Sequence, residues 1–246
     1  MLYRCVMVFA AHPDDEILMS GTMAKMAAEG TRVVVVQMTD GGEGYPEPDM
    51  KDKIVEMRRR EAENANRVLG IAQRYMLNRP DMALVNDKAT LQEVMALIRR
   101  EKPDAAFLQG PHTLHRDHFN TYQIGLEAVW HAGGPVCAAL GPSWRTPEVY
   151  FYKDVAPDRQ SFAVDVKGFG NKLYQALATQ ESQFTLFTQY FGAKSREDFE
   201  REIQRLGREG ERNVEYFWIV RDVMDFDVLP EPSVHRLSTW SPVSAG

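Results

Sequence analysis

Residues 5–16 decide the fold, and they read CVMVFAAHPDDE. The first six residues are apolar without a break, as is typical of a strand that is buried on both faces of a sheet. The stretch ends in the polar group His12-Pro13-Asp14-Asp15-Glu16, rather than in the small residues of a leader-peptide cleavage site. We therefore interpret residues 5–10 as the first strand of a folded domain, with a polar loop at its carboxyl end.

From this strand outward, strand and helix patterns alternate along the chain. Strands are expected at 5–10, 32–38, 74–77 and 105–108, and helices at 16–29, 51–69, 90–101 and 118–131. Such alternation predicts right-handed crossovers and a Rossmann-like α/β fold, in which helices flank a mainly parallel sheet. Ligands of such sheets bind beyond the carboxyl ends of the strands, so the loops that follow the strands are the place to look for chemistry.

The pattern becomes less regular after about Gly133. Strands are expected at 148–152, 161–165 and 214–220, and helices at 170–183 and 196–207. The tail from Pro230 is rich in Pro and Ser and is expected to be irregular. We predict a single domain over residues 1–246, with a Rossmann-like core at about 1–132 and a smaller C-terminal α+β portion at about 133–246.

The composition is that of an ordinary globular domain. Of the 246 residues, 44% are hydrophobic and 26% are charged, and the formal net charge is 29 − 35 = −6. An acidic chain is a poor candidate for binding nucleic acid or an anionic membrane, and no apolar run reaches the roughly 18 residues of a membrane span. With only Cys5 and Cys137 there is no disulfide framework. We expect a cytoplasmic protein with a small-molecule partner.

Two of the loops that follow strands carry histidines and aspartates at the spacing of metal ligands. His12 and Asp15 are three residues apart in the first loop, as are His115 and His118 in the second. In the first turn of a helix this spacing points both side chains the same way. Two histidines and one carboxylate are a usual catalytic zinc set, which leaves a fourth position for a water whose pKa falls toward about 7. Such sites also take iron, manganese or nickel.

The remaining polar residues of these loops suggest roles in hydrolysis. Asp14 neighbours Asp15 but points elsewhere, so it could accept a proton from that water. The leftover histidine of the second loop could stabilise an oxyanion or protonate the leaving amine, and we favour His115 over His112 for this position. The structural alternative is that each Asp caps a helix and each His is idle. The coincidence of both clusters after strands of one sheet favours the metal site.

As a set, these motifs resemble those of the PIG-L (LmbE-like) family of zinc-dependent N-acetylglucosaminyl deacetylases. The resemblance covers roughly residues 4–183 and involves the segments 11–16, 39–44, 58–61, 69–70 and 115–118, with a weaker later pattern at Lys172, Ala176, Ser182 and Gln183. The chain departs from the family pattern at Arg116, where members often have Pro, and at Gln180, near which many carry His.

The resemblance implies a Rossmann-like fold, zinc-dependent removal of an N-acetyl group from an N-acetylglucosamine unit, and self-association. Carried over residue by residue, it implies His12, Asp15 and His118 as zinc ligands. It also implies Asp14 as general base, His115 as oxyanion stabiliser or acid, and Asp117 as a residue that orients a neighbouring His.

Three further residues are candidates for substrate binding. Glu43 could bind sugar hydroxyls, Arg58 could reach the pocket from its charged helix, and Arg116 could meet an acidic group on the substrate or extend into solvent. We predict a hydrolase that removes acetate from an N-acetylated amino sugar or its conjugate. The rivals are a hydrolase of another amide or acyl substrate, from antibiotic or thiol-cofactor metabolism, and a silent sugar-binding protein. A nucleotide-binding protein is disfavoured because the glycine fingerprint is missing.

Overall fold

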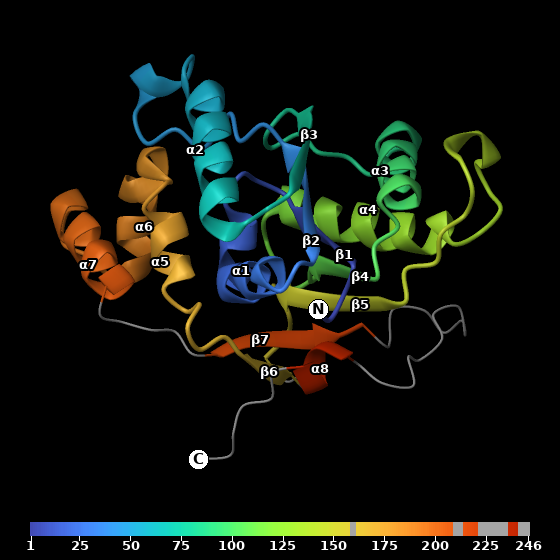
Figure 1. Ribbon diagram of the computed structural model, residues 1–246. Coiled ribbons are helices and arrows are strands. Elements are labelled where there is room, and N and C mark those ends of the chain that lie inside the picture. Colours follow the sequence, from blue (N-terminus) through green and yellow to red (C-terminus); the bar gives the residue numbers. More distant parts are fainter. Residues whose placement is uncertain (158–160, 209–213, 221–235, 241–246) are drawn as a thin grey trace.

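The computed structural model describes residues 1–157, 161–208, 214–220 and 236–240 of the chain. Within these residues, seven strands form one sheet in the order β3-β2-β1-β4-β5-β7-β6 (Figure 1). The strands are β1 (Cys5–Ala10), β2 (Arg32–Thr39), β3 (Gln73–Arg79), β4 (Ala105–Gln109), β5 (Glu148–Lys153), β6 (Phe162–Asp165) and β7 (Val214–Ile219).

The part of the sheet from β3 to β5 is parallel, whereas β7 runs antiparallel to β5 and β6. β1 lies in the middle, where Val8 pairs with Val35 of β2 on one side and Phe107 of β4 on the other. The chain moves outward from β1 to β3 and then crosses to β4, so the strand order reverses between β1 and β4. The predicted parallel sheet is confirmed, and this reversal is where open α/β sheets usually bind ligands.

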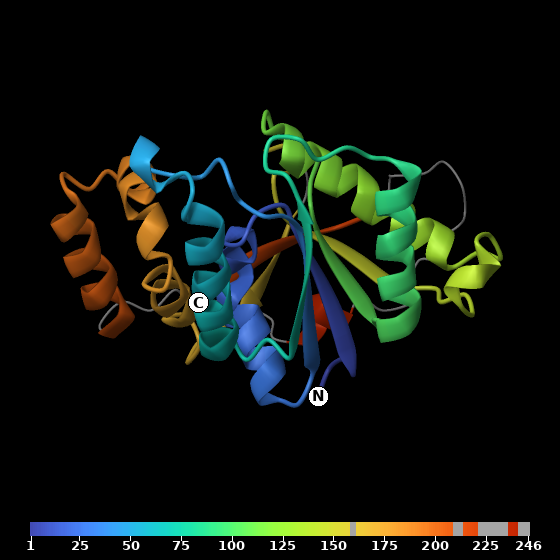
Figure 2. The ribbon, with the colours of Figure 1, turned by 90° about the horizontal axis from the view of Figure 1, so that it is seen from above.

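Helices cover both faces of the sheet, as the sequence pattern predicts. They are α1 (Ser20–Ala28), α2 (Ile54–Leu69), α3 (Lys88–Glu101), α4 (Arg116–Ala132), α5 (Lys172–Leu177), α6 (Phe184–Phe191), α7 (Arg196–Arg208) and α8 (Arg236–Trp240). Seen from above, α3 and α4 lie on one face, and α1, α2 and α5 lie on the other, with α7 outermost (Figure 2). Among the described segments, none of these helices is both long and apolar enough to cross a membrane.

Each face of β1 packs into its own apolar core. Val6 and Val8 point into the core beneath α1 and α5, whereas Met7 and Phe9 point into the core beneath α3 and α4. All residues of β1 are buried, which explains why the strand reads as an unbroken apolar run. Burying one side chain such as Phe9 contributes roughly 1.5–3 kcal/mol. The loop after β1 therefore begins at a strand that is held by packing on both of its faces.

The helix predicted at 16–29 is two elements. Asp15–Met19 form a 3-10 turn, η1, and the α-helix begins only at Ser20. The amides of Gly21 and Thr22 at the start of α1 each donate to the Glu215 carboxylate of β7 at 2.9 Å. A strand near the far end of the chain thus satisfies the first amides of α1, which no local pattern reveals.

The helix predicted at 170–183 is wrong as a single element. α5 ends at Leu177, and Glu181–Gln183 form a separate 3-10 turn, η4. Gln180 has non-helical backbone angles. The amide and hydroxyl of Ser182 each donate to the Glu61 carboxylate of α2 at 2.7 Å, so a tertiary contact holds this turn.

The tail predicted to be irregular contains one short helix. Arg236–Trp240 form α8, and Arg236 donates from Nε to Glu148 of β5 at 2.6 Å. This hydrogen bond and the burial of Leu237 stabilise the helix. Neither contact can be recognised from the composition of the tail. The remainder of the predicted tail, 230–235 and 241–246, lies outside the described residues.

Candidate metal centre and active site

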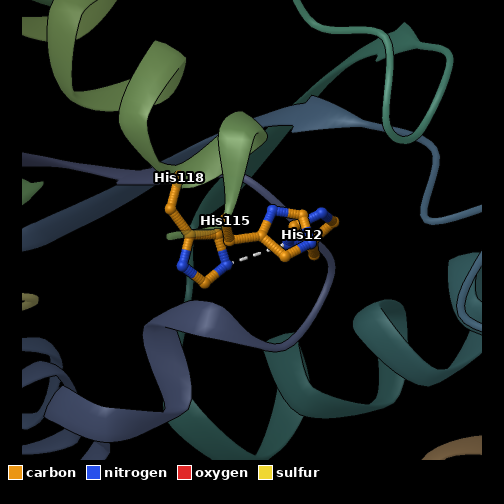
Figure 3. Close-up of side chains that lie close together, drawn as sticks. All are labelled: His12, His115 and His118. Carbon is orange, nitrogen blue, oxygen red and sulfur yellow. Dashed lines mark hydrogen bonds between the residues drawn. The ribbon is translucent and has the colours of Figure 1, made fainter. Parts of the chain in front are cut away.

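The loops after β1 and β4 meet at the strand-order reversal. His12 follows β1, whereas His115 and His118 lie at the start of α4, which follows β4. The three imidazole rings gather in one place, and His12 Nδ1 lies 3.2 Å from His118 Nε2 (Figure 3). The ring centre of His115 lies 4.7 Å from that of His12 and 4.6 Å from that of His118. Residues about a hundred positions apart in sequence therefore share one site.

The Asp15 carboxylate lies against both His12 and His118 and faces each with a different oxygen. Its Oδ2 lies 3.4 Å from His12 Nδ1, and its Oδ1 lies 3.3 Å from His118 Nε2. A tetrahedral zinc ion with bonds of about 2.1 Å would hold its ligand atoms about 3.4 Å apart. Each Asp15 oxygen faces a different histidine nitrogen at about this spacing. Among the described residues, the groups whose ligand atoms all lie within 4.8 Å of one another are His12 with His115 and His118, and His12 with Asp81 and Asp117. The donor atoms around His12 therefore suit a divalent metal such as zinc.

The local backbone fixes two of these side chains. Asp15 begins η1, and its Oδ2 accepts a hydrogen bond from the His12 amide at 2.8 Å. His115 is the N-cap of α4, where its Nδ1 accepts from the amide of Asp117 at 3.3 Å. This cap starts α4 at Arg116, two residues before the predicted start, and places His118 in the first turn.

The far side of the His12 ring faces carboxylates. His12 Nε2 lies 3.2 Å from Asp81 Oδ1 and 3.5 Å from Asp117 Oδ2. Burial alone would lower the pKa of His12, but hydrogen bonds with Asp117, Asp15 and Asp81 raise that pKa well above its ordinary value. A carboxylate on the outer nitrogen of a ligand histidine fixes the tautomer and raises its basicity. The structure thus places Asp117 beside a histidine, as the family resemblance implies, and that histidine is His12.

His115 differs from His12 in its electrostatic surroundings. Burial, followed by the neighbouring His12 and His118, lowers the pKa of His115 below its ordinary value. A neutral His115 whose Nδ1 accepts a hydrogen bond carries its proton on Nε2. The ring can therefore donate one hydrogen bond within the site at neutral pH.

Asp14 is half-buried beside Arg58 of α2. Arg58 Nη2 lies 3.0 Å from Asp14 Oδ1, and Arg58 Nη1 donates to the carbonyl of Gly41 at 3.3 Å. The Arg58 side chain is almost fully buried, and a side chain at Gly41 or Gly44 would collide with its guanidinium. The glycines of the loop after β2 thus allow Arg58 to reach Asp14.

Three other candidate residues lie outside the cluster. Arg116 and His112 are exposed, although both belong to the loop region that carries His115. Glu43 is also exposed, and its carboxylate lies 3.7 Å from Lys51 Nζ. The backbone amide of Glu43 donates to Asp81 at 3.0 Å, so its loop borders the site.

Sequence reasoning missed three charged residues of the site. They are Asp81, which follows β3, Lys153, which ends β5, and Asp154, whose Oδ2 lies 3.1 Å from His118 Nδ1. Lys153 Nζ donates to Asp15 Oδ1 at 2.8 Å. All three lie at carboxyl ends of parallel strands, and applying that rule to every strand would have found them.

Comparisons with known proteins show which proteins this chain is similar to. The model of the PIG-L family, described as GlcNAc-PI de-N-acetylase, matches residues 7–129. Diacetylchitobiose deacetylase of Thermococcus kodakarensis is 30% identical over 190 residues, which cover 73% of this chain and 70% of that protein. The 1D-myo-inositol 2-acetamido-2-deoxy-alpha-D-glucopyranoside deacetylase 1 of Catenulispora acidiphila is 30% identical over 60% of this chain and 55% of its own length.

Among solved structures, the N,N'-diacetylchitobiose deacetylase of Pyrococcus horikoshii superposes with a TM-score of 0.74. It is 26% identical, and the match covers 89% of this chain and 84% of that one. The family match spans half of the chain and includes the segments that carry His12, Asp15 and His118. The chain therefore belongs to the PIG-L family of deacetylases.

Proposed function

We propose that this protein is a zinc-dependent hydrolase that removes the N-acetyl group from an N-acetylglucosamine-type amino sugar or its conjugate. The observation that carries the proposal is the closeness of His12 Nδ1 to His118 Nε2, 3.2 Å apart, with the Asp15 carboxylate between them. Its Oδ2 lies 3.4 Å from the His12 nitrogen, and its Oδ1 lies 3.3 Å from the His118 nitrogen. The names of both relatives denote deacetylation of a 2-acetamido sugar, which supports the substrate class.

His12, Asp15 and His118 would hold the metal ion. When bound, a divalent ion such as zinc supplies Lewis acidity that polarises an amide carbonyl and makes water acidic enough to ionise near neutral pH. The burial of Asp15 between these histidines keeps its carboxylate away from bulk water. The pKa of Asp15 lies well below its ordinary value, because Lys153, His118 and His12 together outweigh the effect of burial. The carboxylate is thus ionised at neutral pH, as a metal ligand must be.

Asp14 is our candidate for the general base. Arg58 holds its Oδ1, which leaves Oδ2 to take a proton from the attacking water and to pass it to the leaving amine. Because Arg58 is buried and engaged by Asp14, we assign it a positioning role within the substrate-binding wall. This positioning role differs from the substrate contact that the sequence suggested for Arg58.

His115 is our candidate for stabilising the oxyanion. Its neutral ring carries a proton on Nε2, and a hydrogen bond from a fixed donor to the developing negative charge lowers the barrier. Glu43, on the loop after β2, and Arg116, at the start of α4, are exposed beside the site, where they would contact sugar hydroxyls or an acidic group of a conjugate.

Acetate release from a panel of N-acetylated compounds tests the proposal. The panel contains N-acetylglucosamine, diacetylchitobiose, an N-acetylglucosaminyl inositol, and simple N-acetyl amino acids as the non-sugar arm. We expect zinc-dependent acetate release from at least one sugar, loss of activity with a chelator, and recovery when zinc is restored. Turnover of the non-sugar amides alone would contradict the substrate class. Sugar binding without acetate release would favour the silent-binding alternative.

A further inference from the structure

We infer that Lys153 and Asp154, at the end of β5, form a positioning pair that orients two of the three proposed metal ligands, Asp15 and His118. This inference rests on the proposed metal site. It assigns a function to two consecutive residues that lie outside the two sequence motifs. Neither residue needs to touch the substrate, because each would act through a ligand.

Asp154 holds the outer nitrogen of His118. Its Oδ2 lies 3.1 Å from His118 Nδ1, so the neutral ring donates from Nδ1 and turns the lone pair of Nε2 inward. That inward nitrogen is the atom that lies 3.2 Å from His12 Nδ1 and 3.3 Å from Asp15 Oδ1. Asp154 thereby selects the tautomer of His118 that can bind a metal at this point.

Lys153 fixes the carboxylate of Asp15. Lys153 Nζ donates to Asp15 Oδ1 at 2.8 Å, whereas Asp15 Oδ2 accepts from the amide of His12 at 2.8 Å. Each oxygen of the carboxylate therefore has its own fixed partner, and the group cannot rotate without breaking one of these bonds. Lys153 Nζ also lies 3.7 Å from Asp154 Oδ2, so a single mostly buried cation links both carboxylates.

The backbone at the end of β5 is irregular, and this irregularity positions Lys153 and Asp154. Leu108 of β4 pairs with Phe151, but Gln109 pairs with Lys153, so β5 contains one extra residue before its end. Asp154 then adopts a φ of +56°, in the left-handed region that few residues other than Gly occupy. Backbone conformations of this kind persist where the surrounding structure holds them, and they cluster at functional sites.

The loop that leads to His115 clamps this conformation. The amide of Gly110 donates to the carbonyl of Lys153, and the amide of His112 donates to the carbonyl of Asp154, both at 2.8 Å. A side chain at Gly110 would collide with the carbonyl of Asp154. The end of β5 and the second histidine loop are therefore hydrogen-bonded to each other. This arrangement holds Lys153 beside Asp15 and Asp154 beside His118.

Two substitutions at Asp154 distinguish the effect of its side chain from the effects of its backbone conformation and its charge. Asp154→Gly tolerates the positive φ and removes the carboxylate, whereas Asp154→Asn tolerates the same φ, removes the same charge and keeps an acceptor oxygen. We would measure the zinc dissociation constant of each variant by competition with a chromophoric chelator. The visible absorption of the Co²⁺ form and the thermal midpoint of the metal-free form complete the comparison.

We expect Asp154→Gly to weaken zinc binding about 10- to 100-fold, as is usual when a partner behind a ligand is lost. Asp154→Asn should restore most of this loss, and both metal-free variants should melt close to wild type. Lys153→Met should weaken the Co²⁺ absorption, because a freed Asp15 can bind through both oxygens and raise the coordination number. Lys153→Arg should keep the wild-type spectrum.

The outcomes distinguish this inference from the proposed function. Wild-type zinc binding together with unchanged affinity in Asp154→Gly and an unchanged spectrum in Lys153→Met would overturn the positioning pair and leave the metal site intact. Failure of the folded wild-type protein to bind zinc would overturn the metal site and this inference with it.

Discussion

At the scale of single residues, Asp14 and Asp15 show how two adjacent carboxylates come to occupy different environments. Asp15 is buried between Lys153 and His118, whereas Asp14 is half-buried and pairs with Arg58 on the opposite side of the loop. The 3-10 turn that begins at Asp15 sends the two side chains apart. In the proposed mechanism, Asp15 would bind the metal and Asp14 would carry the proton.

This division of roles predicts the effect of Asp14→Asn. The amide keeps the shape of the side chain but cannot take a proton, so kcat should fall about 10²- to 10⁴-fold while zinc binding stays at its wild-type level. Acetate release and metal content of the same preparation measure both effects. Asp49→Asn, the same change at an exposed position of the loop after β2, should leave kcat unchanged. Wild-type turnover in Asp14→Asn would remove Asp14 from the mechanism.

The sequence identified the residues of the site that form local motifs and missed those that do not. His12 and Asp15 stand together in the chain, and so do His115 and His118, so their spacing alone pointed to them. Asp154 reaches His118 only because β5 lies beside β4 and its backbone turns through a positive φ. The strand-end rule points to the position after β5. The contact of Asp154 with His118 cannot be derived from a single sequence, because it depends on long-range pairing.

At the scale of elements, the strands were predicted more reliably than the helices. β1 and β2 are buried on both faces, which produces unbroken apolar runs that admit few other interpretations. The helix expected at 170–183 broke into two elements around Gln180, where a contact from Glu61 of α2 replaces regular helix continuation. Local pattern therefore predicts elements whose burial is uniform, and it fails where a tertiary contact decides the boundary.

The carboxylate of Asp104, just before β4, connects the start of β4 to the start of β1. Asp104 Oδ2 accepts from the amides of Arg4 at 2.7 Å and Cys5 at 3.2 Å, and its Oδ1 accepts from the Arg4 guanidinium at 3.2 Å. Burial alone would raise the pKa of Asp104, but these hydrogen bonds lower it below its ordinary value. The ionised carboxylate therefore stabilises the folded state above about pH 4, the usual pKa of an unfolded Asp.

The Asp104→Asn variant should show this dependence on pH. We expect its free energy of unfolding to be about 1 kcal/mol below wild type at pH 7. The gap should narrow as the pH falls below 4 toward the lowered pKa, because the wild-type carboxylate then becomes neutral as well. Urea unfolding at several pH values measures the difference in free energy of unfolding. Asp52→Asn, the same change at an exposed position, is the control. A gap that is constant with pH would contradict the assignment.

At the scale of the whole molecule, the site lies where the order of the sheet reverses. β1 and β4 are neighbours in the sheet, although the chain builds β2 and β3 between them. The two ligand loops therefore come from separate crossovers, and the strands that lead to them, β1 and β4, both pack into the two apolar cores. A metal bound here would join the two crossovers, and it would stabilise the fold as any ligand of the native state does.

Calorimetric titration of zinc into the metal-stripped protein tests whether His12, Asp15 and His118 hold a metal ion. We would compare wild type with His118→Ala and with His112→Ala, a matched control from the same loop region whose side chain is exposed. We expect one tight site per chain in wild type and in His112→Ala, and loss of that site in His118→Ala. Absence of tight zinc binding in the folded wild-type protein, or unchanged binding in His118→Ala, would contradict it.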